Sequence, residues 1–405
     1  MWADWCGFLF CVLAILYTLA GYPLWLAWRT RGASAGAANR TPTSAFEPSV
    51  TILLPVFNGE PWIEQKLQSI WALVYPHEKI QTILISDGST DGTLEKAARF
   101  RGRGPGVGES YVSGNDVIAL DVIESPHAGK PAAINAGLSR ARGEILFFTD
   151  VRQPLDTQSL RYLTSCFLDP TVGAASGELI IRPGATQQED SIGLYWRYEK
   201  WLRKRESALD SVMGATGAIY AMRRELAGPL PPDLLLDDVY LPLLAFFRGY
   251  RVIFEERAIA WDDPTSLKTE FRRKVRTQAG VYQLIRYLPQ LLGRENRSLV
   301  VFLSHKAARL LLPVWFLALA AFSLGLPLRA ALWSLGVQAG FYGLALADVV
   351  VPETFPGKRI TSTARTLVIL LAAAAVAISI IFRPSRNFWT AATGTAVPPQ
   401  AGGPN

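Results

Sequence analysis

An uncharged run of 23 residues near the start of the chain constrains its folding most. Residues 6–28 contain no Asp, Glu, Lys or Arg. As a helix rising 1.5 Å per residue, such a run is long enough to cross the roughly 30 Å hydrocarbon core of a bilayer. A cleaved signal peptide is the alternative, but the run is long and Asp4 precedes it instead of a basic cluster. We therefore predict an uncleaved membrane anchor over residues 1–31.

Three further uncharged runs lie in the C-terminal quarter, at residues 310–328, 330–347 and 366–382. Charged residues make up only 19% of the chain, which is low for a wholly soluble protein. The alternative is that these runs form helices buried in the core of a soluble protein. The presence of four such runs makes this alternative less favourable. We predict about four transmembrane helices, three of them within residues 306–383, followed by a tail at 384–405. Arg383 and Arg386 follow the last run, on the side that the predicted orientation places outside the cytoplasm. The alternative is therefore that residues 366–382 enter only the membrane–water interface and do not cross the bilayer.

Basic residues beside these runs predict the orientation of the chain. They follow the first run and precede the second and fourth, at Arg29, Arg31, Arg40, His305, Lys306, Arg309, Lys358, Arg359 and Arg365. The positive-inside rule places these flanks in the cytoplasm, which predicts a multi-pass inner-membrane protein with a cytoplasmic central domain. Attraction to an anionic leaflet explains the net charge of +7 more simply than nucleic acid does. No nucleic-acid motif occurs, and the sequence specifies no protein partner.

Strand-like and helix-like segments alternate after a small, polar linker at residues 32–48. The strands are predicted at 50–54, 80–86, 117–123 and 145–149, and the helices at 59–71, 93–100 and 131–142. This order predicts an α/β domain over residues 49–270, with a mostly parallel sheet covered by helices on both faces. Residues 271–305 have the pattern of a basic amphipathic helix at a membrane surface, or of a helix packed on the domain.

Ligands of such sheets bind beyond the carboxyl ends of the strands, where several charged residues fall. Asp87 opens a Gly-Ser-Thr-Asp-Gly turn and could accept hydrogen bonds from a base or ribose, although plain turns use the same residues. Asp150 follows an apolar strand and could hold a divalent cation that neutralises a leaving diphosphate. Arg152 could contact phosphate directly or pair with Asp150. Lys130, at a predicted helix start, could meet phosphate or be a solvated lysine.

Asp237 and Asp238 are adjacent in the sequence. Two neighbouring carboxylates in a partly dry cleft raise one another's pKa, which favours a general base. Acids are also common at a helix N-terminus, and an apolar helix-like segment follows them. Both interpretations can hold together.

Seven ordered segments within residues 48–290 resemble the membrane-bound inverting glycosyltransferases of family 2, the group that contains cellulose, chitin and hyaluronan synthases. They are VTILLPVFNGE, ISDGSTDGT, GKPAAINAG, ILFFTD, GATGAIYAMRRE, LLDDVYLPLLAFFRGYRV and FRRKVRTQAG. The resemblance implies a GT-A fold, Rossmann-like and mostly parallel, and transfer of a sugar from a nucleotide-diphosphate donor with inversion. The acceptor would be a polysaccharide or a lipid-linked molecule.

The resemblance also implies roles for individual residues. Pro55, Asn58, Glu60 and Asp87 would line the nucleotide pocket, and Lys130 would lie near the donor and bind substrate. Asp150 would hold Mg²⁺ or Mn²⁺, and Asp238 would be the base, beside Asp237. Beyond the resemblance, we predict that Arg152 and Arg273 bind substrate and that Arg276 assists the leaving diphosphate.

Two departures from the family pattern limit these implications. The family's Asp-x-Asp appears as Asp150-Val151-Arg152, and the Gln-x-x-Arg-Trp of processive members appears as Arg273-Lys274-Val275-Arg276-Thr277. The first departure puts the metal site in doubt, and the second gives no support for processive synthesis. Two alternatives stay open: transfer to a polyprenyl phosphate, which needs no base, and a catalytically inactive scaffold subunit.

Overall fold

The structure is a computed structural model that describes residues 2–32, 46–100, 119–182, 187–352 and 355–389. Most of the predicted linker at 32–48 and most of the tail at 384–405 lie outside these residues.

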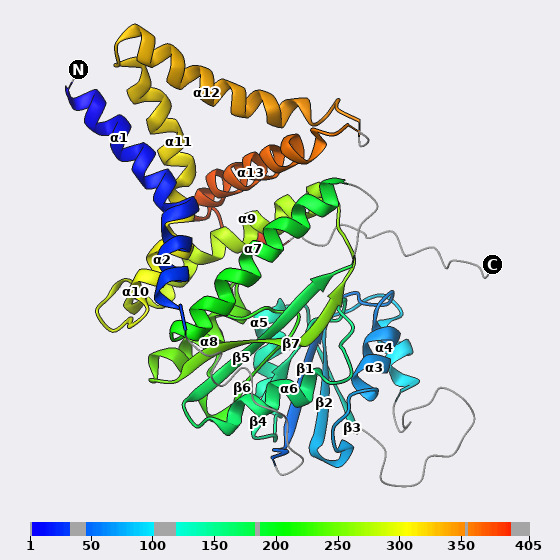
Figure 1. Ribbon diagram of the computed structural model, residues 1–405. Coiled ribbons are helices and arrows are strands. Elements are labelled where there is room, and N and C mark those ends of the chain that lie inside the picture. The colour runs from blue at the N-terminus through cyan, green and yellow to red at the C-terminus, as the bar shows by residue number, and fades with distance from the viewer. Residues whose placement is uncertain (1, 33–45, 101–118, 183–186, 353–354, 390–405) are drawn as a thin grey trace.

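A seven-stranded sheet forms the centre of the domain (Figure 1), in the order β3-β2-β1-β4-β6-β5-β7. Its strands are β1 (Val50–Val56), β2 (Ile80–Asp87), β3 (Ala119–Ser125), β4 (Ile145–Phe148), β5 (Val172–Ile181), β6 (Tyr220–Arg223) and β7 (Arg251–Asp262). All neighbours run parallel except β6, which is antiparallel to both β4 and β5. The predicted mostly parallel α/β sheet is confirmed, and each of the four predicted strands agrees with an observed strand to within two residues.

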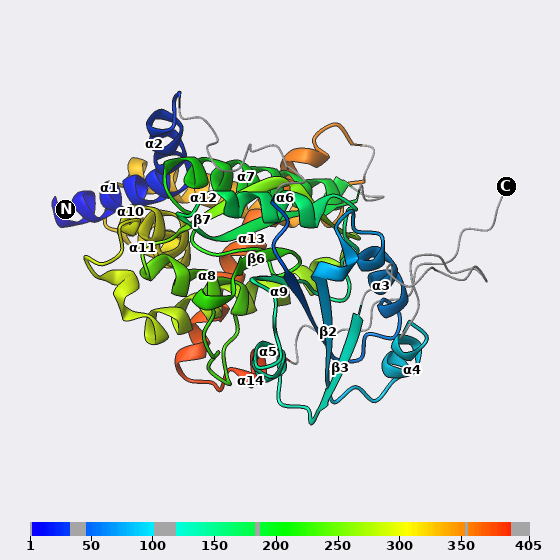
Figure 2. The same ribbon diagram turned by 90° about the horizontal axis from the view of Figure 1, so that it is seen from below.

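Alternating side chains of the central strands fill two cores, one on each face of the sheet. Leu53 of β1 belongs to the core that also contains residues of α5 (Lys130–Leu138), α8 (Asp237–Phe247) and α9 (Leu267–Tyr287). Its neighbours Ile52 and Leu54 belong to the other core, with α3 (Ile63–Trp71), α4 (Thr93–Ala98) and α6 (Ser159–Ser165). Figure 2 shows α5 and α3 on opposite sides of β2. This alternation is the period-2 pattern of a strand buried on both faces.

Two long helices, α7 (Gln187–Leu209) and α9, lie between the sheet and the apolar helices (Figure 1). On α9, Val275, Ala279 and Leu284 are buried in the core of the domain, and the helix also packs against α13 (Lys358–Ala377). Of the two predictions for this segment, the helix packed on the domain describes these contacts.

Four stretches of helix among the described residues are long and apolar enough to cross a membrane: Trp2–Arg29, Leu299–Leu324, Leu328–Ala347 and Lys358–Ile381. Their number agrees with the prediction. The second begins eleven residues before the predicted start at 310, and the fourth includes Lys358 and Arg365, which were predicted to flank it. Both cations pair with the buried carboxylate of Asp348, at 3.2 Å each, and this pairing accounts for charges within an apolar helix.

Candidate active site

A cavity of about 260 Å³ lies beyond the carboxyl ends of the central strands, between the sheet, α7 and α9. It is lined by six of the predicted site residues: Lys130, Asp150, Asp237, Asp238, Arg273 and Arg276. Residues 214–218, which begin the segment GATGAIYAMRRE, line it too. The fold therefore brings together residues that are separated by up to 146 positions in the chain.

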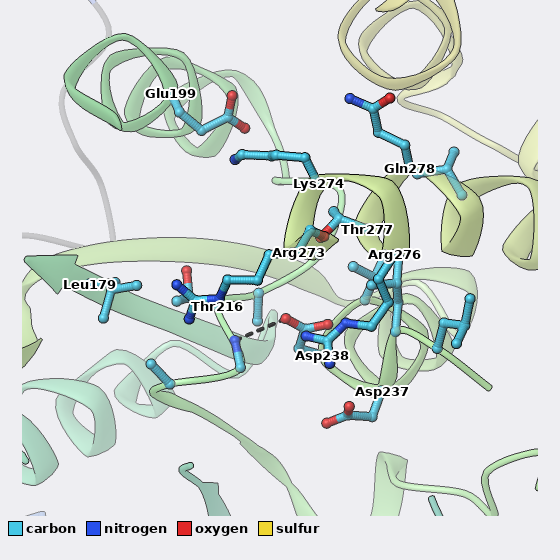
Figure 3. Close-up of a pocket in the computed structure, with 18 of the residues that line it drawn as sticks. Leu179, Glu199, Thr216, Asp237, Asp238, Arg273, Lys274, Arg276, Thr277 and Gln278 are labelled. Atoms are coloured by element: carbon cyan, nitrogen blue, oxygen red, sulfur yellow. Dashed lines mark hydrogen bonds between the residues drawn. The ribbon is translucent and has the colours of Figure 1, made fainter. Parts of the chain in front are cut away.

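Asp238 lies in the first turn of α8, where an acid is favoured by the helix dipole. The backbone N–H of Gly217 donates to Asp238 Oδ2 at 2.9 Å, and the side chain of Arg276 points toward the same carboxylate (Figure 3). Burial, and then the charge of Asp237, raise the pKa of the Asp238 carboxyl. A carboxylate with a raised pKa in a cavity is suited to accept a proton.

Lys130 connects the other two acids of the cavity. Its Nζ lies 2.9 Å from Asp150 Oδ1 and 3.1 Å from Asp237 Oδ2. Burial by itself would lower the pKa of the Lys130 ammonium, but the charges of Asp150, Asp237 and Asp238 outweigh burial and raise it. For Asp150, burial is outweighed by the ammonium of Lys130, and its pKa is lowered. Lys130 is therefore a cation and Asp150 an anion at neutral pH.

Gly217 marks the place where two of the carboxylates converge. A Cβ added to this glycine would stand 3.1 Å from Asp238 Oδ2 and 3.5 Å from Asp150 Oδ2. A Cβ there would contact both acids, so glycine leaves the space between the two carboxylates open.

Asp87 does not line this cavity but fixes the loop that leads to Lys130. Its carboxylate accepts hydrogen bonds from the backbone N–H groups of Ala128, at 2.8 Å, and Gly129, at 3.0 Å. His127 Nδ1 lies 2.9 Å from Asp87 Oδ2. Gly129 has a φ of +93°, a conformation that favours glycine, and α5 begins at the next residue. Asp87 therefore sets the position at which Lys130 enters the site.

Pro55, Asn58 and Glu60 lie at the end of β1 and in the loop after it, outside the cavity lining. Asn58 Oδ1 accepts from Thr90 N–H at 2.9 Å, and Glu60 Oε2 accepts from Gly92 N–H at 3.0 Å. These bonds join the loops after β1 and β2. Their assignment to a nucleotide pocket stays a prediction.

Arg152 pairs with Asp262 and not with Asp150, which corrects one of its two predicted roles. Its Nη2 lies 2.5 Å from Asp262 Oδ2, at the end of β7. Arg273 Nη2 lies 3.5 Å from the same oxygen. Arg152 does not line the cavity, so contact with a phosphate would require it to leave Asp262.

Lys66 is a residue of the site region that the sequence analysis missed. This fully buried lysine of α3 donates to Thr149 Oγ1 at 2.6 Å and to the carbonyl of Gln153 at 2.5 Å, on either side of Asp150. Burial lowers the pKa of Lys66 to about 7. The signal was a lysine on the apolar face of a helix, three residues after Ile63.

The described side chains do not by themselves form the divalent-cation site predicted at Asp150. No group of three His, Cys, Asp or Glu residues suited to a metal ion occurs within the described ranges. Asp150 supplies one carboxylate, and the Lys130 ammonium already contacts it. Divalent cations bind several oxygen ligands and are repelled by a cationic neighbour.

Comparisons with known proteins agree with the predicted fold and family. Residues 51–227 match glycosyl transferase family 2. The mannosyltransferase PcManGT from Pyrobaculum calidifontis, solved in complex with GDP-Man and Mn²⁺, superposes with a TM-score of 0.68 and 23% identity, covering 93% of this chain and 99% of that one. At this identity the likeness concerns the fold alone, and it confirms the predicted GT-A fold.

Two curated relatives are similar over the same domain. The Bacillus subtilis protein named Probable glycosyltransferase YdaM is 24% identical over 62% of this chain and 60% of its own length. The poly-beta-1,6-N-acetyl-D-glucosamine synthase of Staphylococcus aureus strain COL is 25% identical over 58% of this chain and 55% of its own length. The match thus spans less than two thirds of either relative. Residues 51–227 of this chain thus match the glycosyl transferase family 2 model, and the chain is similar over this domain to proteins named as a glycosyltransferase and a polysaccharide synthase.

Proposed function

We propose that this enzyme transfers a sugar from a nucleotide-diphosphate donor to a hydroxyl group of its acceptor, with inversion at the anomeric carbon. Asp238 accepts the proton of the acceptor hydroxyl as its oxygen attacks the anomeric carbon. The bond between that carbon and the donor's diphosphate breaks, and the nucleotide diphosphate leaves with the bonding electrons. One displacement inverts the configuration of the sugar.

The state of Asp238 is the observation that carries this proposal. Its carboxylate is buried, lines the cavity and has a raised pKa. The Gly217 N–H donates to it, and the side chain of Arg276 points toward it (Figure 3). A general base works best when its pKa is close to the working pH, and burial moves Asp238 in that direction.

The cations of the cavity supply the charge that a leaving diphosphate needs. Lys130, Arg273 and Arg276 all line it, and fixed cations stabilise negative charge that develops in a site of low dielectric. The described side chains do not complete the predicted Mg²⁺ or Mn²⁺ site on Asp150 by themselves. The protein's own cations therefore supply neutralising charge, and a divalent ion would add to it only with the donor's phosphate oxygens as further ligands.

Transfer to the phosphate oxygen of a polyprenyl phosphate is the second reading. An anionic phosphate oxygen has no proton to give up, so it would not use Asp238 as a base. A neutral hydroxyl needs the base that Asp238 provides. An inactive scaffold subunit, the third reading, would have no need of a buried carboxylate with a raised pKa.

We also propose that the four apolar helices anchor the enzyme in the inner membrane with its GT-A domain in the cytoplasm. Long apolar side chains project from these helices, such as Leu317 and Trp333, which are 72% and 78% exposed. A bilayer would cover this apolar surface. The basic residues after the first helix favour a cytoplasmic domain by the positive-inside rule. A cytoplasmic domain would also have access to nucleotide sugars.

A screen of nucleotide sugars on the detergent-purified full chain tests the proposal. A donor should raise the melting temperature of the protein and release its nucleotide diphosphate when an acceptor is present. The Asp238→Asn variant should keep the thermal shift and lose the release. Absence of both responses with every uridine, guanosine and thymidine diphosphate sugar would contradict the proposal.

A further inference from the structure

The cavity extends from Asp238 to a candidate membrane helix. Its far end is lined by His305 and Lys306 of η7 (Phe302–Ala307) and by Arg309 and Leu310 of α11 (Ala308–Leu324). These residues belong to the candidate span Leu299–Leu324. One continuous cavity therefore joins the reacting carboxylates to a helix that can enter a bilayer.

Cations outnumber carboxylates at this far end. Arg203 of α7 and Lys274 of α9 line it together with Lys306 and Arg309, and the carboxylates there are Glu199 and Glu270. Glu199 is occupied by two partners: Oε2 is 2.8 Å from Arg309 Nη1, and Oε1 is 3.0 Å from His305 Nε2. Glu270 lies 3.5 Å from Lys274 Nζ. In Figure 3, Lys274 extends from α9 toward Glu199 on α7.

Lys306 lines the cavity with a half-buried side chain and, among the described residues, makes no direct ion pair. The carboxylates of Glu199 and Glu206 attract it without direct contact. An ammonium that lines a cavity without a direct ion pair is suited to contact an anionic ligand.

The helix that carries Lys306 becomes apolar just beyond it. Leu311, Val314 and Leu317 of α11 are exposed, which is the surface that lipid covers in a membrane helix. A basic site at the cytoplasmic start of such a helix matches a lipid whose phosphate lies at the interface and whose chain lies in the bilayer. An uncharged polysaccharide would have no group for these cations.

We propose that the acceptor is a phosphate-linked lipid that already carries a sugar, with its phosphate bound at Lys306, Arg309 and Lys274. This inference rests on the proposed function, because it takes Asp238 as the base that activates the acceptor. The donor's diphosphate takes the cations beside Asp238, which are Lys130, Arg273 and Arg276. The anionic part of the acceptor therefore binds at the other basic end. A neutral hydroxyl of the carried sugar reaches Asp238.

Binding to the full chain in phosphatidylcholine nanodiscs tests this inference without requiring the donor to be known. The probe is a synthetic polyprenyl diphosphate that carries one hexose. Lys306→Gln removes one charge-assisted contact and should raise the Kd about tenfold or more. Arg29→Gln removes an equal charge from the exposed flank of the first helix and should change the Kd less than about twofold, since exposed charges at a distance are screened.

The outcomes separate the parts of the inference. An unchanged Kd in Lys306→Gln overturns the phosphate site. Displacement of the probe by inorganic pyrophosphate at equal affinity overturns the lipid assignment, because a soluble anion would then suffice. Glycosylation of a sugar-free polyprenyl phosphate on its phosphate overturns the hydroxyl assignment. Lys306-dependent probe binding in a protein that binds neither UDP nor GDP would support the lipid-phosphate site and contradict the proposed function, and with it the assignment of the lipid as acceptor.

Discussion

The ammonium of Lys130 lies 2.9 Å from Asp150 Oδ1. A lysine thus contacts the carboxylate at which the sequence predicts a divalent cation. The same ammonium also contacts Asp237, so one cation serves two acids of the cavity. Because of this contact, we expect a divalent cation to bind Asp150 weakly when no nucleotide is present.

Mn²⁺ should bind the protein alone only weakly, because Asp150 offers one carboxylate and Lys130 repels a second cation. UDP or GDP should raise the affinity for Mn²⁺ because phosphate oxygens add ligands. By reciprocity, Mn²⁺ should raise the nucleotide affinity by the same factor. Calorimetry with each ligand, in the presence and absence of the other, measures both factors. Tight binding of Mn²⁺ without nucleotide would contradict this prediction.

Asp238→Asn should lower the transfer rate by about 10²–10⁴, the usual effect of losing a general base, and leave donor affinity nearly unchanged. Asp237→Asn is the matched control. It removes a contact to Lys130 without removing the base, so its effect on the rate should be smaller. Steady-state rates and nucleotide titrations of both variants make the comparison. Equal and mild losses in the two would count against Asp238 as the base.

The rate should rise with pH and level off above the pKa of Asp238, which burial and Asp237 raise to about 6. The base acts only when deprotonated, so a higher pH increases its active fraction until all of it is ionised. A profile of kcat/KM between pH 5 and 8 tests the sign. A rate that falls across this range would mean that the essential group acts as an acid.

Lys66→Met should remove a pH dependence of stability. Burial lowers the pKa of Lys66 from 10.5 to about 7, so between these values the unfolded chain binds more protons than the folded one. The free energy of unfolding should therefore rise with pH in that window through this group. Melting temperatures of the wild type and of Lys66→Met from pH 7 to 10 isolate the contribution. Parallel curves would show that Lys66 contributes none of it.

A cysteine at Glu95, which is exposed on the domain, should resist an impermeant thiol reagent in intact cells, because the domain is predicted to be cytoplasmic. The matched cysteine at Arg329, which is exposed at the start of the third apolar helix, Leu328–Ala347, should react. Both substitutions are introduced into a variant in which Cys6, Cys11 and Cys166 have been replaced, so that only the new cysteine can react. Labelling of Glu95→Cys without lysis, and none of Arg329→Cys, would reverse the orientation.

Local sequence was sufficient for the elements of this fold. The uncharged run at 6–28 can satisfy its backbone in lipid only as a helix, and the Trp2–Arg29 helix contains it. Asp87 and Asp150 directly follow apolar strand segments, so parallel pairing brings both to one edge of the sheet. Such features depend on residues close together in the chain.

Tertiary structure decided which charges meet. Arg152 pairs with Asp262, which is 110 positions away in the chain. The pair forms because β7 ends beside the loop after β4. No local sequence pattern predicts that these two segments are neighbours. Lys66 is held between Thr149 and Gln153 for the same reason. The extension of the cavity from Asp238 to Lys306 depends on how α7 and α9 pack between the sheet and α11. Ion pairs and cavities arise from the distances between elements, which a periodic pattern of residues does not specify.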